Sequence, residues 1–418
     1  MSISSPFAAS RTAPPQVPDR TRSPSAQSKA STVSLATIRT LTLLQPERIV
    51  FGSGCALECA AEIQRLGLRR VLLVTNPPIV PLAQPLVDRL RTEGATVTIV
   101  TDVPAEPGVA AFAARLADAD ALDLDAVIGF GGGSVLDIAK LLAAYHRTGW
   151  KVREHFGIGL LPGRSLKLFC LPTTAGTGSE VSPNAILLDE AEQLKKGVVS
   201  PWLLADGAFV DPALTLTVPP GLTAATGIDA LTHCIEAYAN KFAHPIVDLY
   251  ALEGVRLIGA HIARAVADGR DLEARSAVAL GSLYGGLCLG PVNTAAVHAL
   301  AYPLGGEFHI PHGLSNALLL PHVLRFNLPA APERYAAIAR ALGVPAGGSD
   351  AATAARGIDR LAQLCAKCGL PAGLRAAGIP ADALPRLAVA AMKVTRLLKN
   401  NPRDLTAADA EAIYRAAW

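Results

Sequence analysis

Short apolar runs alternate with amphipathic stretches through the first half of the chain. The runs are typical of buried strands and are found at 69–76, 95–102, 125–134 and 166–171. Helical periodicity fills the intervals between them, most clearly at 81–93 and 108–119. Strands that alternate with helices form parallel sheets built from βαβ units. The pattern therefore predicts an α/β fold for this part of the chain.

After the prolines of VPP (218–220), strand-like runs almost disappear. Segments with helical periodicity fill the remainder, at 222–240, 245–268, 272–289, 334–343, 352–370 and 382–398. We therefore expect an α/β parallel-sheet domain over residues 35–218 and an all-helical domain over residues 219–418. Residues 1–34 are rich in Ser, Pro, Ala and Thr without apolar periodicity, so we expect them to form a disordered leader.

The charge balance argues against a polyanionic partner. Lys and Arg number 38 against 35 Asp and Glu, which gives a net charge of +3 in 418 residues. We expect no nucleic acid or membrane partner, because both need a strongly basic surface. A cytoplasmic location follows, although an Arg- and Ser-rich leader poor in acids also suits organelle targeting.

Two features of the composition have structural interpretations. The seven scattered cysteines do not suggest a disulfide framework, and the CAKC pair Cys365 and Cys368 lacks the second pair of a zinc ribbon. The uncharged stretch 276–297 is long enough to cross a membrane, but four glycines and Pro291 interrupt it. We expect a pair of thiols on a helix and a buried helix packed closely through its glycines.

A glycine turn, GFGGGSVLDIAK (129–140), follows a strand and opens a helix. Glycines allow a ligand to approach the backbone, and free N–H groups at a helix start favour phosphate. Ser134 is a natural N-cap, and Asp137 three residues later resembles a capping box. The turn departs from the usual GxGxxG dinucleotide pattern, so simple strand-to-helix geometry remains an alternative.

A second stretch, LPTTAGTGSEVSPNAIL (171–187), follows the last predicted strand of the sheet. Its small hydroxyl side chains supply hydrogen bonds with little bulk, which suits a loop over a pyrophosphate or ribose. Ligands of open α/β sheets bind at the carboxyl ends of strands, where this loop lies. The alternative is a polar surface loop.

Two segments contain candidate metal ligands. GIDALTHCIEAY (227–238) places Asp229 and His233 four residues apart, on one face of a helix. NTAAVHALAYPLGGEFHIPHG (293–313) adds His298, His309 and His312. Carboxylate and imidazole together suit Fe²⁺ or Zn²⁺. Single histidines on apolar segments are more often core residues, and spacing alone does not exclude His309 as a ligand.

Four motifs, GGGSVLDIAK, PTTAGTGSEV, TGIDALTHCIEAY and HALAYPLGGEFHIPHG, strongly resemble the iron-containing (group III) alcohol dehydrogenase family. The resemblance runs from about Pro46 to the C-terminus, with a weaker similarity to glycerol dehydrogenase and dehydroquinate synthase. It implies an N-terminal α/β nucleotide-binding domain, a C-terminal all-helical metal-binding domain, and a metal in the cleft between them.

The resemblance also implies specific site residues. The metal ligands would be Asp229, His233, His298 and His312, whereas His309 matches none. Residues that match the family's cofactor contacts are Gly132, Gly133, Ser134, Val135 and Asp137 in the first loop, Thr173, Thr174 and Thr177 in the second, and Asn184 and Lys196 beyond it.

The activity implied is hydride transfer between NAD or NADP and a small primary or secondary alcohol, or the matching aldehyde or ketone. Fe²⁺ would be the metal, with Zn²⁺ as the alternative, and the chain would form a homo-oligomer, a dimer. Two residues depart from the family pattern. Tyr302 replaces a histidine that lines the substrate site and relays protons, and Asn76 replaces the ribose-binding aspartate of NAD-preferring relatives.

Three other functions remain open at this stage. A maleylacetate reductase would reduce a keto-acid, but such members lack the intact set of Asp229 and His233. A dehydroquinate-synthase-like lyase would act on a sugar phosphate without net use of nicotinamide. A non-enzymatic scaffold would have no need for intact ligands.

Overall fold

A six-stranded parallel sheet forms the centre of the N-terminal half. The computed structural model describes residues 38–192 and 194–418. The strands lie in the order β1-β9-β6-β4-β2-β3, and every neighbouring pair is parallel. They are β1 (Arg48–Phe51), β2 (Arg70–Val74), β3 (Thr96–Val100), β4 (Ala126–Gly131), β6 (Lys167–Pro172) and β9 (Gly207–Val210). The predicted α/β class is confirmed.

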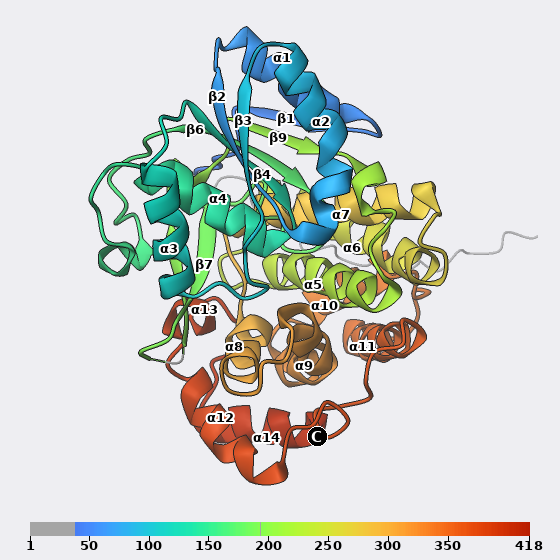
Figure 1. The fold of residues 1–418 in the computed structure, drawn as a ribbon. Coiled ribbons are helices and arrows are strands. Elements are labelled where there is room, and N and C mark those ends of the chain that lie inside the picture. Colours follow the sequence, from blue (N-terminus) through green and yellow to red (C-terminus); the bar gives the residue numbers. More distant parts are fainter. Residues whose placement is uncertain (1–37, 193) are drawn as a thin grey trace, which may run out of the picture. The chain divides into compact units, whose positions relative to one another are not determined.

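Helices cover both faces of this sheet because its central strands are apolar on both sides. Val71 and Leu73 of β2 pack with α1 (Glu58–Arg65) and α2 (Val80–Thr92) on one face. Leu72 and Val74 point the other way and pack with α3 (Val109–Asp120) and α4 (Gly133–Tyr145). Successive strand residues face opposite sides, so one continuous apolar run supplies two cores. Figure 1 shows the two helical layers.

A second, three-stranded sheet lies beside α4. Its order is β5-β8-β7, with bounds β5 (Gly157–Ile158), β7 (Asn184–Asp189) and β8 (Leu194–Val199). β7 and β8 form an antiparallel hairpin, whereas β5 joins β8 in parallel. The sequence patterns did not predict this sheet, because β7 alternates partly buried and buried residues and β8 is partly buried over its first four residues and carries two lysines.

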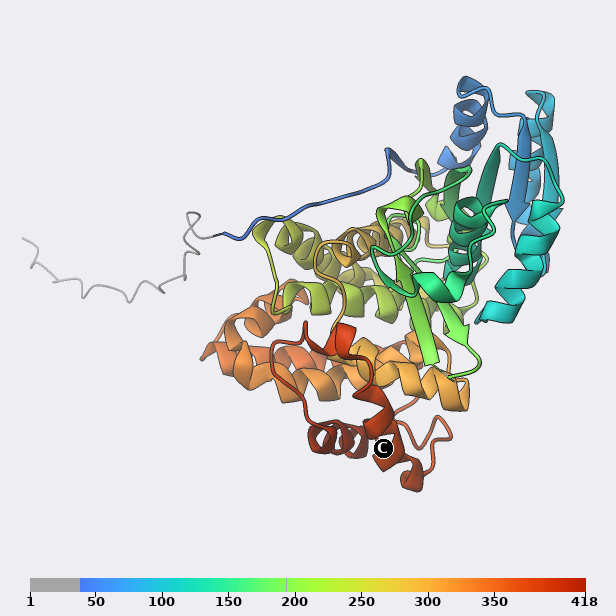
Figure 2. The same cartoon turned by 90° about the vertical axis from the view of Figure 1, so that its left-hand side faces the viewer.

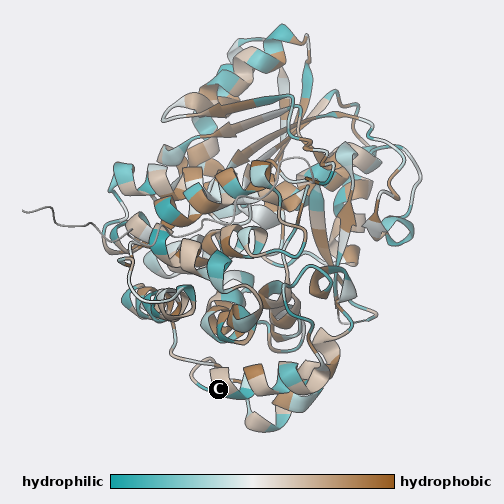
Figure 3. Ribbon diagram, turned by 180° about the vertical axis from the view of Figure 1, so that it is seen from behind, coloured by the Kyte–Doolittle hydropathy of each residue, from teal (hydrophilic) through white to brown (hydrophobic). Residues whose placement is uncertain are grey.

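Helices make up the chain from Pro220 onward. They are α5 (Pro220–Tyr238), α6 (Pro245–Ala267), α7 (Leu272–Leu289), α8 (Ala296–Phe308), α9 (His312–Asn327), α10 (Pro332–Ala341), α11 (Asp350–Lys367), α12 (Leu384–Ala391), α13 (Thr395–Leu398) and α14 (Ala407–Ala417). One large apolar cluster joins most of them. Figures 1 and 2 show this group on one side of the large sheet. The large sheet is mainly hydrophobic, and hydrophilic positions gather on outer helices and loops (Figure 3).

Helix α7 packs through glycines, as its sequence predicts. A Cβ on Gly286 would lie 2.6 Å from the carbonyl oxygen of Gly178, in the loop between β6 and β7. A Cβ on Gly285 would lie 3.2 Å from Cβ of His233 on α5. The helix ends at Leu289, before Pro291. None of the described helices has both the length and the apolar character that a membrane crossing needs.

The structure corrects two local predictions. Helix α4 begins at Gly133 with Gly132 as its N-cap, and no side chain caps it, so Ser134 is not the N-cap. The expected helix over 382–398 is broken into a short 3-10 turn (Ala381–Ala383), α12 and α13. By contrast, all seven cysteines are buried free thiols, with Cys365 in α11 and Cys368 at its end.

Two predictions about chain organisation stay untested. The expected disordered leader at 1–34 lies outside the described residues. Every described strand precedes Asp211 and every described residue range after Pro220 is helix or loop, but residues 41–418 form one compact unit. The boundary at 218 and 219 therefore remains a proposal.

The contact between Gly286 and Gly178 leads to a stability prediction. Gly286→Ala should lower the free energy of unfolding by about 1–3 kcal/mol, because the added methyl group meets backbone that cannot move aside. Urea and thermal unfolding midpoints would measure the loss. Gly290→Ala is the matched control, since its Cβ would meet only Pro183 at 3.5 Å. Equal midpoints for the two variants would contradict the close contact.

Candidate active site

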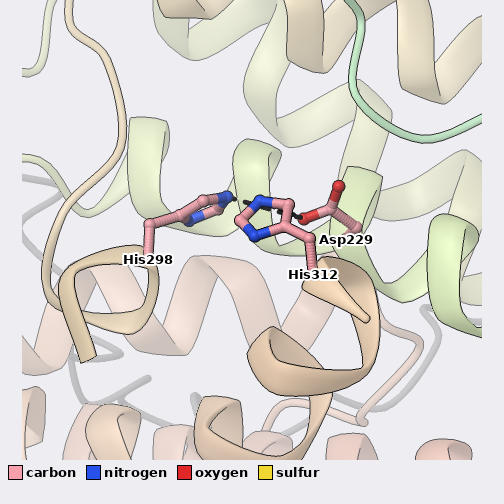
Figure 4. Close-up of side chains that lie close together, drawn as sticks. All are labelled: Asp229, His298 and His312. Carbon is pink, nitrogen blue, oxygen red and sulfur yellow. Dashed lines mark ion pairs between the residues drawn. The ribbon is translucent and has the colours of Figure 1, made fainter. Parts of the chain in front are cut away.

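Three imidazoles converge on one carboxylate oxygen at the centre of the helical half. On α5, Asp229 and His233 lie one turn apart, and Nε2 of His233 is 3.9 Å from Oδ1 of Asp229. Helix α8 contributes His298, and the first turn of α9 contributes His312. Their Nε2 atoms lie 3.5 Å and 3.7 Å from the same Oδ1 (Figure 4).

These spacings suit a shared metal ion. Ligand atoms about 2.1 Å from a tetrahedral ion are about 3.4 Å from one another. Asp229, His298 and His312 form the tightest group, with one ligand atom from each within 4.8 Å of the others. His233 joins at the edge, since its ring stacks on that of His298 with centroids 4.7 Å apart.

Electrostatics favours the ligand forms of two of these groups. Burial alone would raise the pKa of the Asp229 carboxyl, but the electrostatic interactions with the surrounding histidines and a hydrogen bond from His298 hold it well below its usual range. Burial lowers the pKa of His312 to about 3. A metal site needs an ionised carboxylate and neutral imidazoles. Asp229 and His312 therefore already have the protonation states that ligation requires.

His298 is held by a residue that the sequence analysis missed. Oε2 of Glu236 accepts a hydrogen bond from Nδ1 of His298 at 2.6 Å, and Oε1 accepts one from the N–H of Val297 at 2.6 Å. Burial lowers the pKa of His298, but the charges of Glu236 and Asp229 and the hydrogen bonds to both carboxylates together outweigh it and raise the pKa to about 9. A carboxylate on Nδ1 directs Nε2 toward Asp229, as in many metal sites.

A second missed residue, Asn316, lies one turn after His312 on α9. Its Nδ2 donates to Oδ1 of Asp229 at 2.6 Å and lies 3.1 Å and 3.3 Å from Nε2 of His298 and His312. Its Oδ1 is buried without a hydrogen-bond partner in the described part of the chain. Oδ1 of Asp229 and the Nε2 atoms of His298 and His312 thus surround one point of positive charge, which in this structure is the amide nitrogen of Asn316. The residues present fit a divalent ion.

Helical spacing is the signal that would have found both missed residues. Asp229, His233 and Glu236 follow one another at i, i+4 and i+7, which places all three on one face of α5. Likewise, His312 and Asn316 are separated by four residues on α9. His309 shares no such face. It is exposed and adopts a left-handed backbone (φ 55°) as the C-cap of α8.

A cleft of about 910 Å³, including solvent at its mouth, joins this cluster to the glycine turn. His233, His298, Tyr302 and His312 line one part of it. Other predicted site residues that line it are Gly133, Ser134, Asp137, Thr177 and Asn184.

The two predicted cofactor loops meet at adjacent strand ends. Gly131 of β4 pairs with Pro172 of β6, and the N–H of Thr173 donates to the carbonyl oxygen of Gly131 at 2.9 Å. A Cβ on Gly133 would lie 2.6 Å from Cγ2 of Thr177. Because no side chain caps α4, its first N–H groups remain available to an anion. The prediction that both loops serve one ligand gains a geometric basis.

Some predicted cofactor residues are engaged elsewhere. Asp137 accepts hydrogen bonds from Ser179 at 2.6 Å and from the N–H of Ile186 at 2.9 Å, so it braces the second loop. Lys196 pairs with Asp189 at 3.2 Å and Glu192 at 2.6 Å. Residues of the predicted set that do not line the cleft are Asn76, Gly132, Val135, Thr173, Thr174 and Lys196. The geometry gives no support to Lys196 as a cofactor contact.

One cleft thus joins a helix start suited to a phosphate to a cluster of one carboxylate with three imidazoles. This combination defines a class of enzymes that use a dinucleotide together with a metal ion. Comparisons with known proteins agree. Residues 46–212 match the family model described as iron-containing alcohol dehydrogenase, and residues 223–418 match its C-terminal counterpart. The chain belongs to the iron-containing alcohol dehydrogenase family.

Individual relatives cover nearly the whole chain. Long-chain-alcohol dehydrogenase 1 of Geobacillus thermodenitrificans is 42% identical over 385 residues, which are 89% of this chain and 96% of that protein. Sulfoacetaldehyde reductase of Bilophila wadsworthia is 34% identical over 85% of this chain and 94% of its own length. A crystal structure of 1,3-propanediol oxidoreductase superimposes with a TM-score of 0.88 at 34% identity, over 91% of this chain and all of that one.

The family membership confirms the predicted class of activity. The protein is an NAD(P)-dependent oxidoreductase that interconverts alcohols and aldehydes, and its family supports iron and NAD as the cofactors. The matches do not favour the maleylacetate reductase or the dehydroquinate-synthase-like lyase.

The Glu236–His298 contact leads to a prediction on metal affinity. Glu236→Gln should weaken Zn²⁺ binding roughly 10- to 100-fold, because the amide keeps an acceptor for Val297 but loses the charge that orients the imidazole. Competition with a chromogenic chelator would measure the affinity. Glu253→Gln on α6 is the control, since that carboxylate pairs with exposed Arg256. Equal affinities in wild type and Glu236→Gln would remove the orienting role.

Proposed function

We propose that Asp229, His233, His298 and His312 together hold one divalent ion, Fe²⁺ with Zn²⁺ as the alternative. The observation that supports this most directly is the convergence of three imidazoles on Oδ1 of the buried Asp229. The ion would lie in the cleft that also reaches the start of α4, where the nicotinamide nucleotide would bind.

The chain's own residues supply positioning. When bound, the ion polarises the substrate oxygen and the nicotinamide exchanges hydride with the substrate carbon. The start of α4 and Thr177 would hold the nucleotide, and Glu236 would keep the imidazole of His298 in its ligating orientation. Because the nucleotide site and the metal site line one cleft, the cofactor and the substrate would be held next to each other for the reaction.

Tyr302 would close the substrate end of the cleft. It is 7% exposed, and its ring centroid lies 6.1 Å from that of His312. Burial raises the pKa of the phenol, which therefore keeps its proton at neutral pH. We propose that Tyr302 forms the substrate pocket and donates a hydrogen bond there, in place of the proton-relaying histidine of many relatives.

The substrate would be a small alcohol or aldehyde, and the assembly a homodimer. Strand β1 is an edge of the large sheet, so its outer backbone groups could pair with a second copy. Sedimentation analysis would test the dimer. A cytoplasmic location remains a prediction of the sequence.

The ligand set leads to the first activity prediction. His298→Ala should lose most bound metal and nearly all turnover, because the variant lacks a buried ligand, while NADH binding persists. Metal analysis, steady-state kinetics and NADH fluorescence would measure the three properties.

His309→Ala is the matched control, because its exposed imidazole lies at a helix end in the same segment. It should retain its metal. Loss of metal in both variants to the same extent would overturn the proposed ligand assignment.

Cofactor preference depends on Asn76 in this proposal. The residue follows β2, and its amide, oriented so that Nδ2 donates to the carbonyl oxygens of Val103 (2.9 Å) and Thr75 (3.1 Å), leaves Oδ1 as an acceptor. A neutral acceptor can bind a ribose hydroxyl without repelling a 2′-phosphate. We therefore propose that the enzyme uses both NAD and NADP, with NAD moderately favoured.

Asn76→Asp should shift the preference further toward NAD by roughly 1–3 kcal/mol, since a carboxylate repels the phosphate dianion. The ratio of kcat/KM for the two cofactors, measured in both proteins, gives the shift. An unchanged ratio would show that residue 76 does not face the ribose.

A further inference from the structure

Arg396 is an unusual guanidinium in the wall of the cleft. It lies on α13, is partly buried, and lines the same cleft as His298, Tyr302 and His312. Its Nη1 is buried and has no hydrogen-bond partner among the residues described. An unpaired polar atom in such a place costs free energy unless a ligand completes it.

Other shielded arginines of this chain do have partners. Arg164 pairs with Asp206 at 2.5 Å, and Arg334 pairs with Asp248 at 2.5 Å. Arg275, which is 4% exposed, donates to the hydroxyl of Thr223 and to two backbone carbonyl oxygens. Arg396 differs from these three because one of its buried nitrogens, Nη1, has no partner among the described residues, although the guanidinium also hydrogen-bonds to Tyr302.

The acidic groups of the cleft do not neutralise Arg396. Two carboxylates line the cleft, those of Glu106 and Asp137. Glu106 pairs with Lys195 at 2.7 Å, and Asp137 accepts from Ser179 and the N–H of Ile186. Both acids are therefore engaged by other groups, and among the described residues neither forms an ion pair with Arg396.

Tyr302 connects Arg396 to the metal cluster. Its ring lies beside that of His312, and Arg396 acts on its phenol by charge and by a hydrogen bond. A substrate whose reacting carbon lies at the histidine cluster would therefore extend past Tyr302 toward the guanidinium.

We infer that Arg396 binds an anionic group of the substrate, so that the physiological alcohol or aldehyde carries a carboxylate, sulfonate or phosphate. This rests on the proposed function, because the reacting end must lie at the metal cluster. A guanidinium presents paired N–H donors that match the oxygens of such groups. The same wall disfavours long neutral alkyl chains, which would bury Arg396 without a counter-charge.

The test compares matched aldehydes with metal-loaded enzyme and NADH at constant ionic strength. Succinic semialdehyde is set against butanal, and sulfonate and phosphate analogues of the same length identify the preferred anion. The wild type should favour one anionic aldehyde in kcat/KM. Arg396→Met, which keeps an apolar stem, should reduce the anionic-to-neutral ratio roughly 10- to 100-fold, and Arg396→Lys should retain part of it.

Lys399→Met is the control, because it removes a positive charge from an exposed side chain of the same segment. Its ratio should match the wild type. A wild type that prefers butanal, or a ratio unmoved in Arg396→Met, would overturn the inference while butanal reduction leaves the proposed function standing. A higher KM for NADH in Arg396→Met without a change in the ratio would also overturn it, in favour of a cofactor contact. If no aldehyde were reduced, both proposals would fail.

Discussion

The burial of Asp229 is the constraint on which the rest of the site depends. An ionised carboxylate that is 2% exposed is tolerated only when hydrogen bonds and positive charge surround it. Three imidazoles and the amide of Asn316 provide this environment, and they come from three different helices. Those helices must therefore meet at one point, and Glu236 extends the same polar network outward through His298.

Much of the fold follows from local patterns in the sequence. Strands such as β2 and β4 are recognisable because they are apolar on both faces, and α5 to α7 are recognisable from long helical periodicity. The hairpin of β7 and β8 is not predicted from the sequence, because one of its faces is only half-buried and because Lys195 and Lys196 resemble loop residues. The break between α12 and α13 is not predicted either, because an apolar run indicates that a segment is buried but does not indicate where a helix ends.

The candidate site is predictable to a smaller extent. Asp229 and His233 are visible as a helical pair, and the resemblance to a family singles out His298 and His312. Helical spacing places Glu236 and Asn316 on the same helix faces as the ligands, but it does not show which residues on other helices they contact. The Glu236–His298 contact spans 62 residues, and the cleft brings Arg396 to helices that are far away in the sequence. Residues of this kind become identifiable only when the tertiary contacts are known.

The glycine face of α7 has a consequence for the geometry of the whole cleft. Through Gly286 the helix contacts the backbone of the loop that carries Thr177, and through Gly285 it contacts the helix that carries His233. Helix α7 therefore lies between the nucleotide site and the metal site. Because its contacts on both sides are made by glycines, no side chain adds to the distance between the two sites. A Cβ would lie 2.6 Å from the backbone of the loop at Gly286 and 3.2 Å from Cβ of His233 at Gly285, so a side chain at either position would press against one of the two sites. Hydride transfer depends steeply on the distance between the two reacting carbons. These two glycines have no reactive group, yet they determine how closely the nicotinamide can approach a substrate at the metal.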